Sequence, residues 1–289
     1  MLRSFKIGKL FGIPLYIHTT FFLLPAWVLL SNPGIGSMNA LFLMLVLVGL
    51  FTCVILHELG HALMARFFGI GTESITLYPI GGVARLQRMS EKPFEEICIA
   101  LAGPAVTLAL VILFTPLAFA GALFGGLSFD PGTSLGAGVG AFFIQLWVAN
   151  ALLLGFNLLP CFPMDGGRVF RAVLSHWKGQ LRATEIAVKV GLVVAFFIAC
   201  LSVWMLSPMP IVVAVFVLMA GQMELMALRQ REARRQAARF AQPLYEAVEV
   251  IDPTQEPAQP NEAFSGVAWD SRHRVWVQWH NGRPVAYWG

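Results

Sequence analysis

Two histidines and a glutamate in the segment 54–68, VILHELGHALMARFF, have the spacing of a metal-dependent hydrolase. His57 and His61 are four residues apart, so on a helix both imidazoles lie on one face and can bind one ion. Zn²⁺ held by three protein ligands lowers the pKa of a bound water to about 7. Glu58 can then act as the catalytic base that accepts the proton of that water. The alternative is a polar patch that only holds helices together.

The segment lies in a chain with the composition of a membrane protein. Of its 289 residues, 57% are hydrophobic and 12% are charged, and the mean hydropathy is +0.70. A helix needs about 20 apolar residues to cross a hydrocarbon core of ~30 Å. Six stretches are long enough: 14–31, 38–65, 97–124, 139–159, 186–206 and 209–228. We therefore expect an all-α polytopic membrane protein of about six transmembrane helices, in which an intramembrane ionisable cluster indicates function.

Basic residues alternate between the connections of these spans. Lys and Arg precede the first span and follow the second, fourth and sixth, whereas the connections at 31–37, 125–138 and 207–210 contain none. The positive-inside rule then places both termini in the cytoplasm, and the net charge of +4 is a signal of topology. The first span is too long for a signal peptide and is expected to remain as an anchor. His57 lies about 13 Å along the helix from Arg66, so the cluster is expected nearer the cytoplasmic face.

A third metal ligand is expected in the segment 157–170, NLLPCFPMDGGRVF. Its two prolines prevent a regular helix, and its two glycines free the backbone just after Asp165. Non-helical backbone at membrane depth occurs only where it is buried in protein or lines a wet cavity. A broken helix end can therefore bring this carboxylate to the histidines. Two alternatives stay open: Asp165 is a solvated helix cap, or Glu224 on a later helix is the third ligand.

In these motifs the sequence resembles the site-2 protease family of intramembrane zinc metalloproteases. HELGH at 57–61 resembles the family's H-E-x-x-H, and NLLPCFPMDGG at 157–167 resembles its N-x-x-P motif followed by D-G. LYPIGGVARL at 77–86 resembles the glycine-containing loop or hairpin after the zinc helix, and ALAGPAVTLAL at 100–110 is similar more loosely. The resemblance covers about residues 5 to 228. It is strongest to the sporulation-type and CBS-type branch, although we expect neither a CBS pair nor a PDZ insertion here.

The resemblance implies a role for each motif residue. His57, His61 and Asp165 would bind one Zn²⁺ per chain, and Glu58 would be the catalytic base. Asn157 would contact the substrate backbone or the developing oxyanion. For Asn157 a hydrogen bond to a neighbouring helix is the structural alternative.

The resemblance also implies the kind of substrate. The family performs regulated intramembrane proteolysis, so the expected partner is a single-pass transmembrane protein in the lipid bilayer, and no nucleic acid is expected. A helix that is cut must unwind, and its backbone then needs new hydrogen-bond partners. The segment around Gly81 and Gly82 could pair with it as an added strand, with an ordinary interfacial turn as the alternative. The expected location is a bacterial inner membrane.

Two other functional classes fit the sequence less well. A catalytically inactive pseudoprotease that binds membrane segments would be expected to lose Glu58 or a metal ligand, and none is lost. A metal transporter would be expected to distribute its ligands along a path. Here the candidate ligands cluster beside one candidate base.

The residues after the last span are expected to form a separate cytoplasmic tail. We divide the chain into a six-helix intramembrane metalloprotease domain at 1–228, a basic helix and linker at 229–260, and a small Trp-rich β-hairpin at 261–289. Alternating apolar residues around Asn281-Gly282 are typical of a hairpin. The tail is a candidate surface for a regulatory partner.

Overall fold

The computed structural model describes residues 4–31, 36–79, 81–88, 90, 92–125, 135–204, 206, 209–246, 264–270 and 273–288. Parts of the predicted connections at 31–37, 125–138 and 207–210, and residues 247–260 of the predicted basic helix and linker at 229–260, lie outside the described residues. The chain divides into two compact units, Met1–Leu225 and Met226–Gly289, which are considered one at a time.

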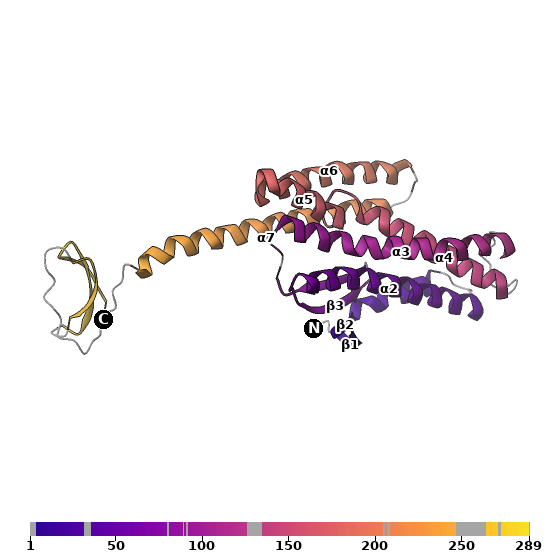
Figure 1. The fold of residues 1–289 in the computed structure, drawn as a ribbon, viewed down its shortest axis with the longest axis horizontal. Helices are drawn as coiled ribbons and strands as arrows, with labels where there is room; N and C mark the ends of the chain where they lie inside the picture. Colours follow the sequence, from indigo (N-terminus) through magenta and orange to yellow (C-terminus); the bar gives the residue numbers. More distant parts are fainter. Residues whose placement is uncertain are drawn as a thin grey trace. The chain divides into compact units, whose positions relative to one another are not determined.

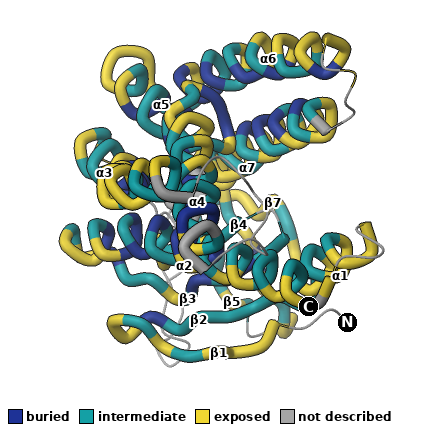
Figure 2. Tube along the Cα trace, turned by 90° about the vertical axis from the view of Figure 1, so that its right-hand side faces the viewer, coloured by how far each residue is buried: buried dark blue, intermediate teal, exposed yellow. Residues whose placement is uncertain are grey.

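Long apolar helices make up most of the first unit, as predicted (Figure 1). The helices of the chain are α1 (Leu23–Leu30), α2 (Ser37–Phe67), α3 (Pro93–Gly125), α4 (Leu135–Asn157), α5 (Asp165–Lys178), α6 (Gln180–Trp204) and α7 (Met209–Glu246). Among the described residues, five helices, α2, α3, α4, α6 and α7, are long and apolar enough to cross a bilayer, with mean hydropathies of 1.8 to 2.6. Only 22% to 28% of each most apolar stretch is buried within the protein, so most of its surface is free to face lipid (Figure 2).

The first predicted span is not one helix. In place of a helix over 14–31, the chain forms strand β2 (Ile13–His18), the 3-10 turn η1 (Thr19–Phe22) and the short helix α1. The strand sequence IPLYIH is rich in β-branched and aromatic residues, and neighbouring strands on both sides satisfy its backbone groups. The prediction of a continuous helix is wrong there because hydropathy does not distinguish a paired apolar strand from a helix.

The segment from β2 to α1 nevertheless packs lengthwise against part of α2. Ile13 packs with Leu59 in the C-terminal half of α2, whereas Phe21 and Leu24 pack further back along the helix, beside Phe51. The rings of Phe21 and Phe51 lie edge to face at 4.5 Å. This segment therefore runs antiparallel to α2, in the place where the sequence predicted the first span.

A four-stranded sheet lies against α2. Its strands β1 (Ser4–Leu10), β2, β3 (Thr72–Tyr78) and β4 (Gly81–Leu86) are hydrogen-bonded in that order. The strands β2 and β3 are parallel, and the other pairs are antiparallel. The predicted loop or hairpin at 77–86 is thus a hairpin, and β4 forms one edge of the sheet. An edge strand has unpaired backbone groups that can accept a further strand.

Helix α3 is the central helix of the bundle around the site. It packs against α2, α4 and α5, and Figure 1 shows α2, α3 and α4 lying side by side. At the start of α5, Gly166 and Gly167 pack directly against the backbone of the turn at 158–162, with no room for a Cβ. This close approach fixes the first turn of α5, where Asp165 is located.

A buried ion network joins α5 to two other helices. The guanidinium of Arg171 donates to Glu96 on α3 through both Nε and Nη2, and it donates through Nη1 to Glu224 on α7 at 2.9 Å. The guanidinium also lies over the ring of Phe162, 5.3 Å from its centroid. Arg171 and Glu96 are both buried. Because removing one partner of a buried ion pair leaves an unpaired charge, this network holds α5 against α3 and α7.

The second unit ends in a small antiparallel sheet. Its strands are β5 (Gly266–Asp270), β6 (Val275–His280) and β7 (Arg283–Trp288), with β6 in the middle. The predicted hairpin is the β6–β7 pair, and both residues of its turn, Asn281 and Gly282, have positive φ. The third strand, β5, was not predicted. The predicted basic helix at the start of 229–260 is helical and forms the C-terminal part of α7, which ends at Glu246.

Candidate active site

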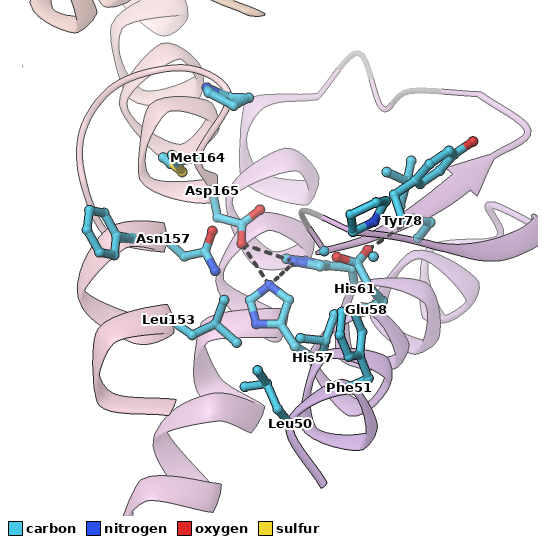
Figure 3. A pocket seen from close by; sticks show the side chains of 18 of the residues that line it. Leu50, Phe51, His57, Glu58, His61, Tyr78, Leu153, Asn157, Met164 and Asp165 are labelled. Carbon is cyan, nitrogen blue, oxygen red and sulfur yellow. Dashed lines mark hydrogen bonds and ion pairs between the residues drawn. The ribbon is translucent and has the colours of Figure 1, made fainter. Parts of the chain in front are cut away.

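Three side chains from two helices converge on one point. The Nε2 atoms of His57 and His61 are 3.1 Å apart, and Oδ2 of Asp165 lies 3.2 Å from the first and 3.1 Å from the second. All three residues are buried. Figure 3 shows the two imidazoles rising from α2 to meet the carboxylate, with the short contacts drawn as dashed lines. Among the described residues, this is the one group of three His, Cys, Asp or Glu side chains arranged to hold a metal ion.

Helix α3 orients both imidazoles. Nδ1–H of His61 donates to the backbone carbonyl of Ile99 at 2.7 Å. The hydroxyl of Thr107 donates to the carbonyl of Gly103 at 3.3 Å, so its oxygen accepts the Nδ1–H of His57 at 2.8 Å. The protons are thereby assigned to the two Nδ1 atoms, which leaves a lone pair on each Nε2. Partners of this kind fix the tautomer and the ring orientation of metal-binding histidines.

The resulting arrangement suits a bound cation. The lone pairs of His57 and His61 and the carboxylate oxygen of Asp165 face one another at 3.1 to 3.2 Å, with no proton assigned between them. Ligands around tetrahedral zinc are roughly 3.3 Å apart, because each lies about 2.0–2.1 Å from the ion. A Cβ at Gly103 would collide with both imidazoles. The absence of a side chain at Gly103 therefore makes room for the two imidazole rings. The spacing of His57, His61 and Asp165 fits a zinc ion.

Glu58 lies beside this cluster but takes no part in it. Its Oε2 accepts a hydrogen bond from the backbone N–H of Ala84 at 3.0 Å, on the edge strand β4. A Cβ at Gly82 would lie 2.7 Å from Cγ of Glu58. The glycine allows β4 to approach the carboxylate closely, so the edge strand and the candidate base are in direct contact.

A cavity of about 800 Å³ connects these groups. Its polar lining includes the histidines, Glu58, Asp165, Asn157 and Arg168. Most of the remaining wall is apolar and comes from α2, α4 and β4: Leu50, Phe51, Val54, Val83, Ala84, Leu86, Ala149, Leu152, Leu153 and Phe156. An apolar cavity with a few converging polar groups is the usual form of a binding site.

The structure brings the sequence-predicted site residues to this one cavity. Asn157, the last residue of α4, points toward the three converging side chains in Figure 3. Gly81 and Gly82 begin β4 and line the same cavity. Glu224, the alternative third ligand, instead pairs with Arg171.

Several contributors to the site were not predicted from the sequence. Ile99, Gly103 and Thr107 lie four residues apart on α3, in and beside the segment 100–110 that only loosely matched the family. A small residue and a hydroxyl at helical spacing within an apolar span could have indicated this face. Ala84 contributes through its backbone N–H, which no side-chain motif can reveal.

The chain matches peptidase family M50 over residues 45–130 and 123–198, more than half of its length. It is 33% identical over 222 residues to a zinc metalloprotease of Methanocaldococcus jannaschii, across 76% of this chain and 60% of that protein. It is 27% identical over 207 residues to stage IV sporulation protein FB of Bacillus subtilis, across 71% of this chain and 62% of that protein. The structure is similar to that of the site-2 protease from M. jannaschii, with a TM-score of 0.54 and 32% identity, covering 77% of this chain and 95% of that one.

The chain therefore belongs to peptidase family M50, the site-2 protease family, as its motifs predicted. It is a multi-pass integral membrane protein. It spans 60% and 62% of the length of the two curated relatives above. The cluster of His57, His61 and Asp165, together with relatives named zinc metalloproteases, identifies Zn²⁺ as the cofactor.

Replacing Thr107 with Val should weaken zinc binding by about 10- to 100-fold, because the valine cannot accept the Nδ1–H of His57. The measurement is competition with a chelator in detergent-purified protein. Thr52→Val is the matched control, since the Thr52 hydroxyl donates only within its own helix, to Val48 at 2.8 Å. Equal zinc affinities for the Thr107 variant and the wild type would contradict the orienting role.

Proposed function

We propose that this chain is an intramembrane zinc metalloprotease that hydrolyses peptide bonds within or near transmembrane segments of membrane-tethered substrates. The observation that carries the proposal is the three-ligand cluster with a carboxylate beside it, at the wall of a cavity within apolar helices. The family membership and the names of the relatives support the same activity. Neither a pseudoprotease nor a transporter gains support from a specific contact.

The residues divide the chemistry between them. His57, His61 and Asp165 would hold the metal, which when bound supplies a Lewis acid that polarises a carbonyl and acidifies water. Glu58 accepts a proton as the water oxygen adds to the scissile carbonyl carbon. Glu58 then delivers this proton to the peptide nitrogen as the C–N bond breaks and its electron pair stays on the nitrogen. The second proton of the water passes from the acid product to the amine or to solvent, so the products are a carboxylate and an amine or ammonium group.

The edge strand β4 is suited to hold the substrate next to this base. Its hairpin partner β3 covers one side of β4, and the opposite edge faces Glu58. An unwound substrate segment that pairs with β4 would replace its lost helical hydrogen bonds. Gly81 and Gly82 keep this edge free of side chains, and Asn157 lies across the cavity, where its amide can bind the substrate backbone or the oxyanion.

We infer that the partner is a single-pass transmembrane protein that enters from the bilayer. The metal-binding cluster is buried, and most of the cavity wall is apolar. An unfolded apolar segment fits such a wall better than the surface of a folded soluble protein does. The Trp-rich sheet of the second unit remains a candidate surface for a regulatory partner.

Glu58→Gln should abolish cleavage while leaving the zinc content at about one per chain, because the amide cannot accept the proton and the three ligands are intact. The measurements are elemental analysis and cleavage of a transmembrane reporter protein in proteoliposomes. His57→Ala is the comparison variant, which should lose both metal and activity. Cleavage by the Glu58 variant at the wild-type rate would rule out the assigned base.

Cleavage should be faster for substrates whose helix is weak near the scissile bond. A Gly costs a helix about 1 kcal/mol and a Pro about 3 kcal/mol relative to Ala, so one Gly should raise the rate roughly fivefold if unwinding limits it. The test compares matched transmembrane substrates by their initial rates. In the control substrate the same Gly lies two turns away from the cut. Equal rates for all of these substrates would argue against unwinding at β4.

We further propose that the protein resides in a bacterial inner membrane, with both termini in the cytoplasm and the site nearer the cytoplasmic face. The alternation of basic and uncharged connections supports this orientation. In a chain whose four native cysteines are replaced, an impermeant thiol reagent should label cysteines at Ser31, Asp130 and Ser207 from outside intact cells. A cysteine at Ser90 should be labelled only after lysis. Labelling of position 90 in intact cells would reverse the proposed topology.

A further inference from the structure

Two arginines on α5 have opposite environments. Arg171 is buried and is paired with Glu96 and Glu224. Arg168, almost one turn earlier on the same helix, lines the cavity together with the metal-binding cluster. Its Nε is buried and has no hydrogen-bond partner among the described residues. Arg171 is thus paired with two carboxylates, whereas no carboxylate within the described part of the chain pairs with Arg168.

A buried Nε donor of a guanidinium without a partner is costly. A buried donor without a partner costs roughly 1–3 kcal/mol, and more when the group is charged. Such a group in a native structure calls for an explanation, and a ligand that is bound only during function is one. The carboxylates of Asp165 and Glu58 line the same cavity, but neither forms an ion pair with Arg168 among the described residues. The unpartnered Nε–H of Arg168, at the wall of this cavity, is therefore available to a negatively charged group that enters it.

The proposed reaction creates such a group at this place. When the water oxygen adds to the scissile carbonyl carbon, the π electron pair of the C=O bond moves onto the carbonyl oxygen. That oxygen becomes negative, and it is one of the two carboxylate oxygens of the product after the C–N bond breaks. A guanidinium presents planar donors that match a carboxylate, and a fixed donor is most effective where charge develops in a site with little water.

We propose that Arg168 binds the scissile carbonyl oxygen as it becomes negative and then the carboxylate of the product. This inference rests on the proposed protease activity. It assigns Arg168 the role of a catalytic residue and leaves Asn157 to hold the substrate backbone. Arg171, by contrast, is a structural residue, because both of its partners are protein carboxylates.

The first test is kinetic and uses the zinc-loaded, full-length protein with a single-pass transmembrane reporter. Arg168→Met should lower kcat by about 10²- to 10³-fold, the usual loss for one oxyanion donor, with KM, zinc content and thermal unfolding near wild type. Lys178→Met, which removes an exposed cation from the end of the same helix, should leave kcat unchanged. If KM rises and kcat is retained, Arg168 binds a ground-state feature of the substrate, such as an acidic side chain, and the proposal is wrong.

The second test is chemical rescue, to which a residue that only maintains the fold would not respond. Added guanidinium ion at millimolar concentration should restore part of the activity of Arg168→Ala, and potassium at equal ionic strength should not. Arg171→Met should instead lower the thermal stability, and guanidinium should not restore its activity. An unrescued Arg168→Ala that has also lost its zinc would assign Arg168 to the fold and overturn the proposal.

The two proposals fail in different ways. If wild-type protein with bound zinc cuts no transmembrane reporter, or if Glu58→Gln still cuts it, the protease assignment itself fails. If the wild type cuts and Glu58→Gln does not, while Arg168→Met cuts at the wild-type rate, only the role of Arg168 fails.

Discussion

The site depends on one constraint: three metal-binding atoms must be held close together inside an apolar helix bundle. The Nε2 atoms of His57 and His61 and the Oδ2 atom of Asp165 lie within 3.2 Å of one another, a spacing that matches three ligands around one zinc ion. Two features of the fold hold this arrangement. Helix α3 fixes both imidazoles through the carbonyl of Ile99 and the hydroxyl of Thr107. The packed first turn of α5 supplies the carboxylate.

The apolar surroundings explain why charged and backbone groups near the site are paired within the protein. Backbone and charged groups within a membrane protein need internal partners. The Arg171 network satisfies three charges at once, and the sheet satisfies the backbone of β2 and β3 from both sides. Two features at the cavity keep unpartnered groups for a ligand: β4 is an edge strand, and Nε of Arg168 has no hydrogen-bond partner among the described residues. These free groups match the two needs of a peptide that is being cut, which are strand pairing and charge stabilisation.

The sequence predicted which side chains converge at the site better than it predicted the first elements of the fold. HELGH and NLLPCFPMDGG indicated the candidate ligands and the neighbouring carboxylate because metal binding and general-base chemistry require particular side chains. The prediction of a helix for the first span was wrong because this segment forms a strand. The pairing of Leu15 with Ile75 joins segments far apart in the chain, and a hydropathy window does not detect such pairing. The contributions of Ile99 and Ala84 come from a backbone carbonyl and a backbone N–H, which leave no mark on residue type. Arg168 and Arg171 look alike in the sequence, and only the packing of α3, α5 and α7 distinguishes them.

The central claim, that two histidines and one carboxylate hold one zinc ion, is tested most directly by X-ray absorption at the zinc edge of the purified, full-length protein. We expect one zinc per chain with nitrogen and oxygen neighbours at about 2.0–2.1 Å, and a scattering pattern that contains two imidazoles. A sulfur neighbour at about 2.3 Å would instead indicate a cysteine ligand. That result, or protein that is fully folded and active without zinc, would show that these three residues do not form a catalytic zinc site.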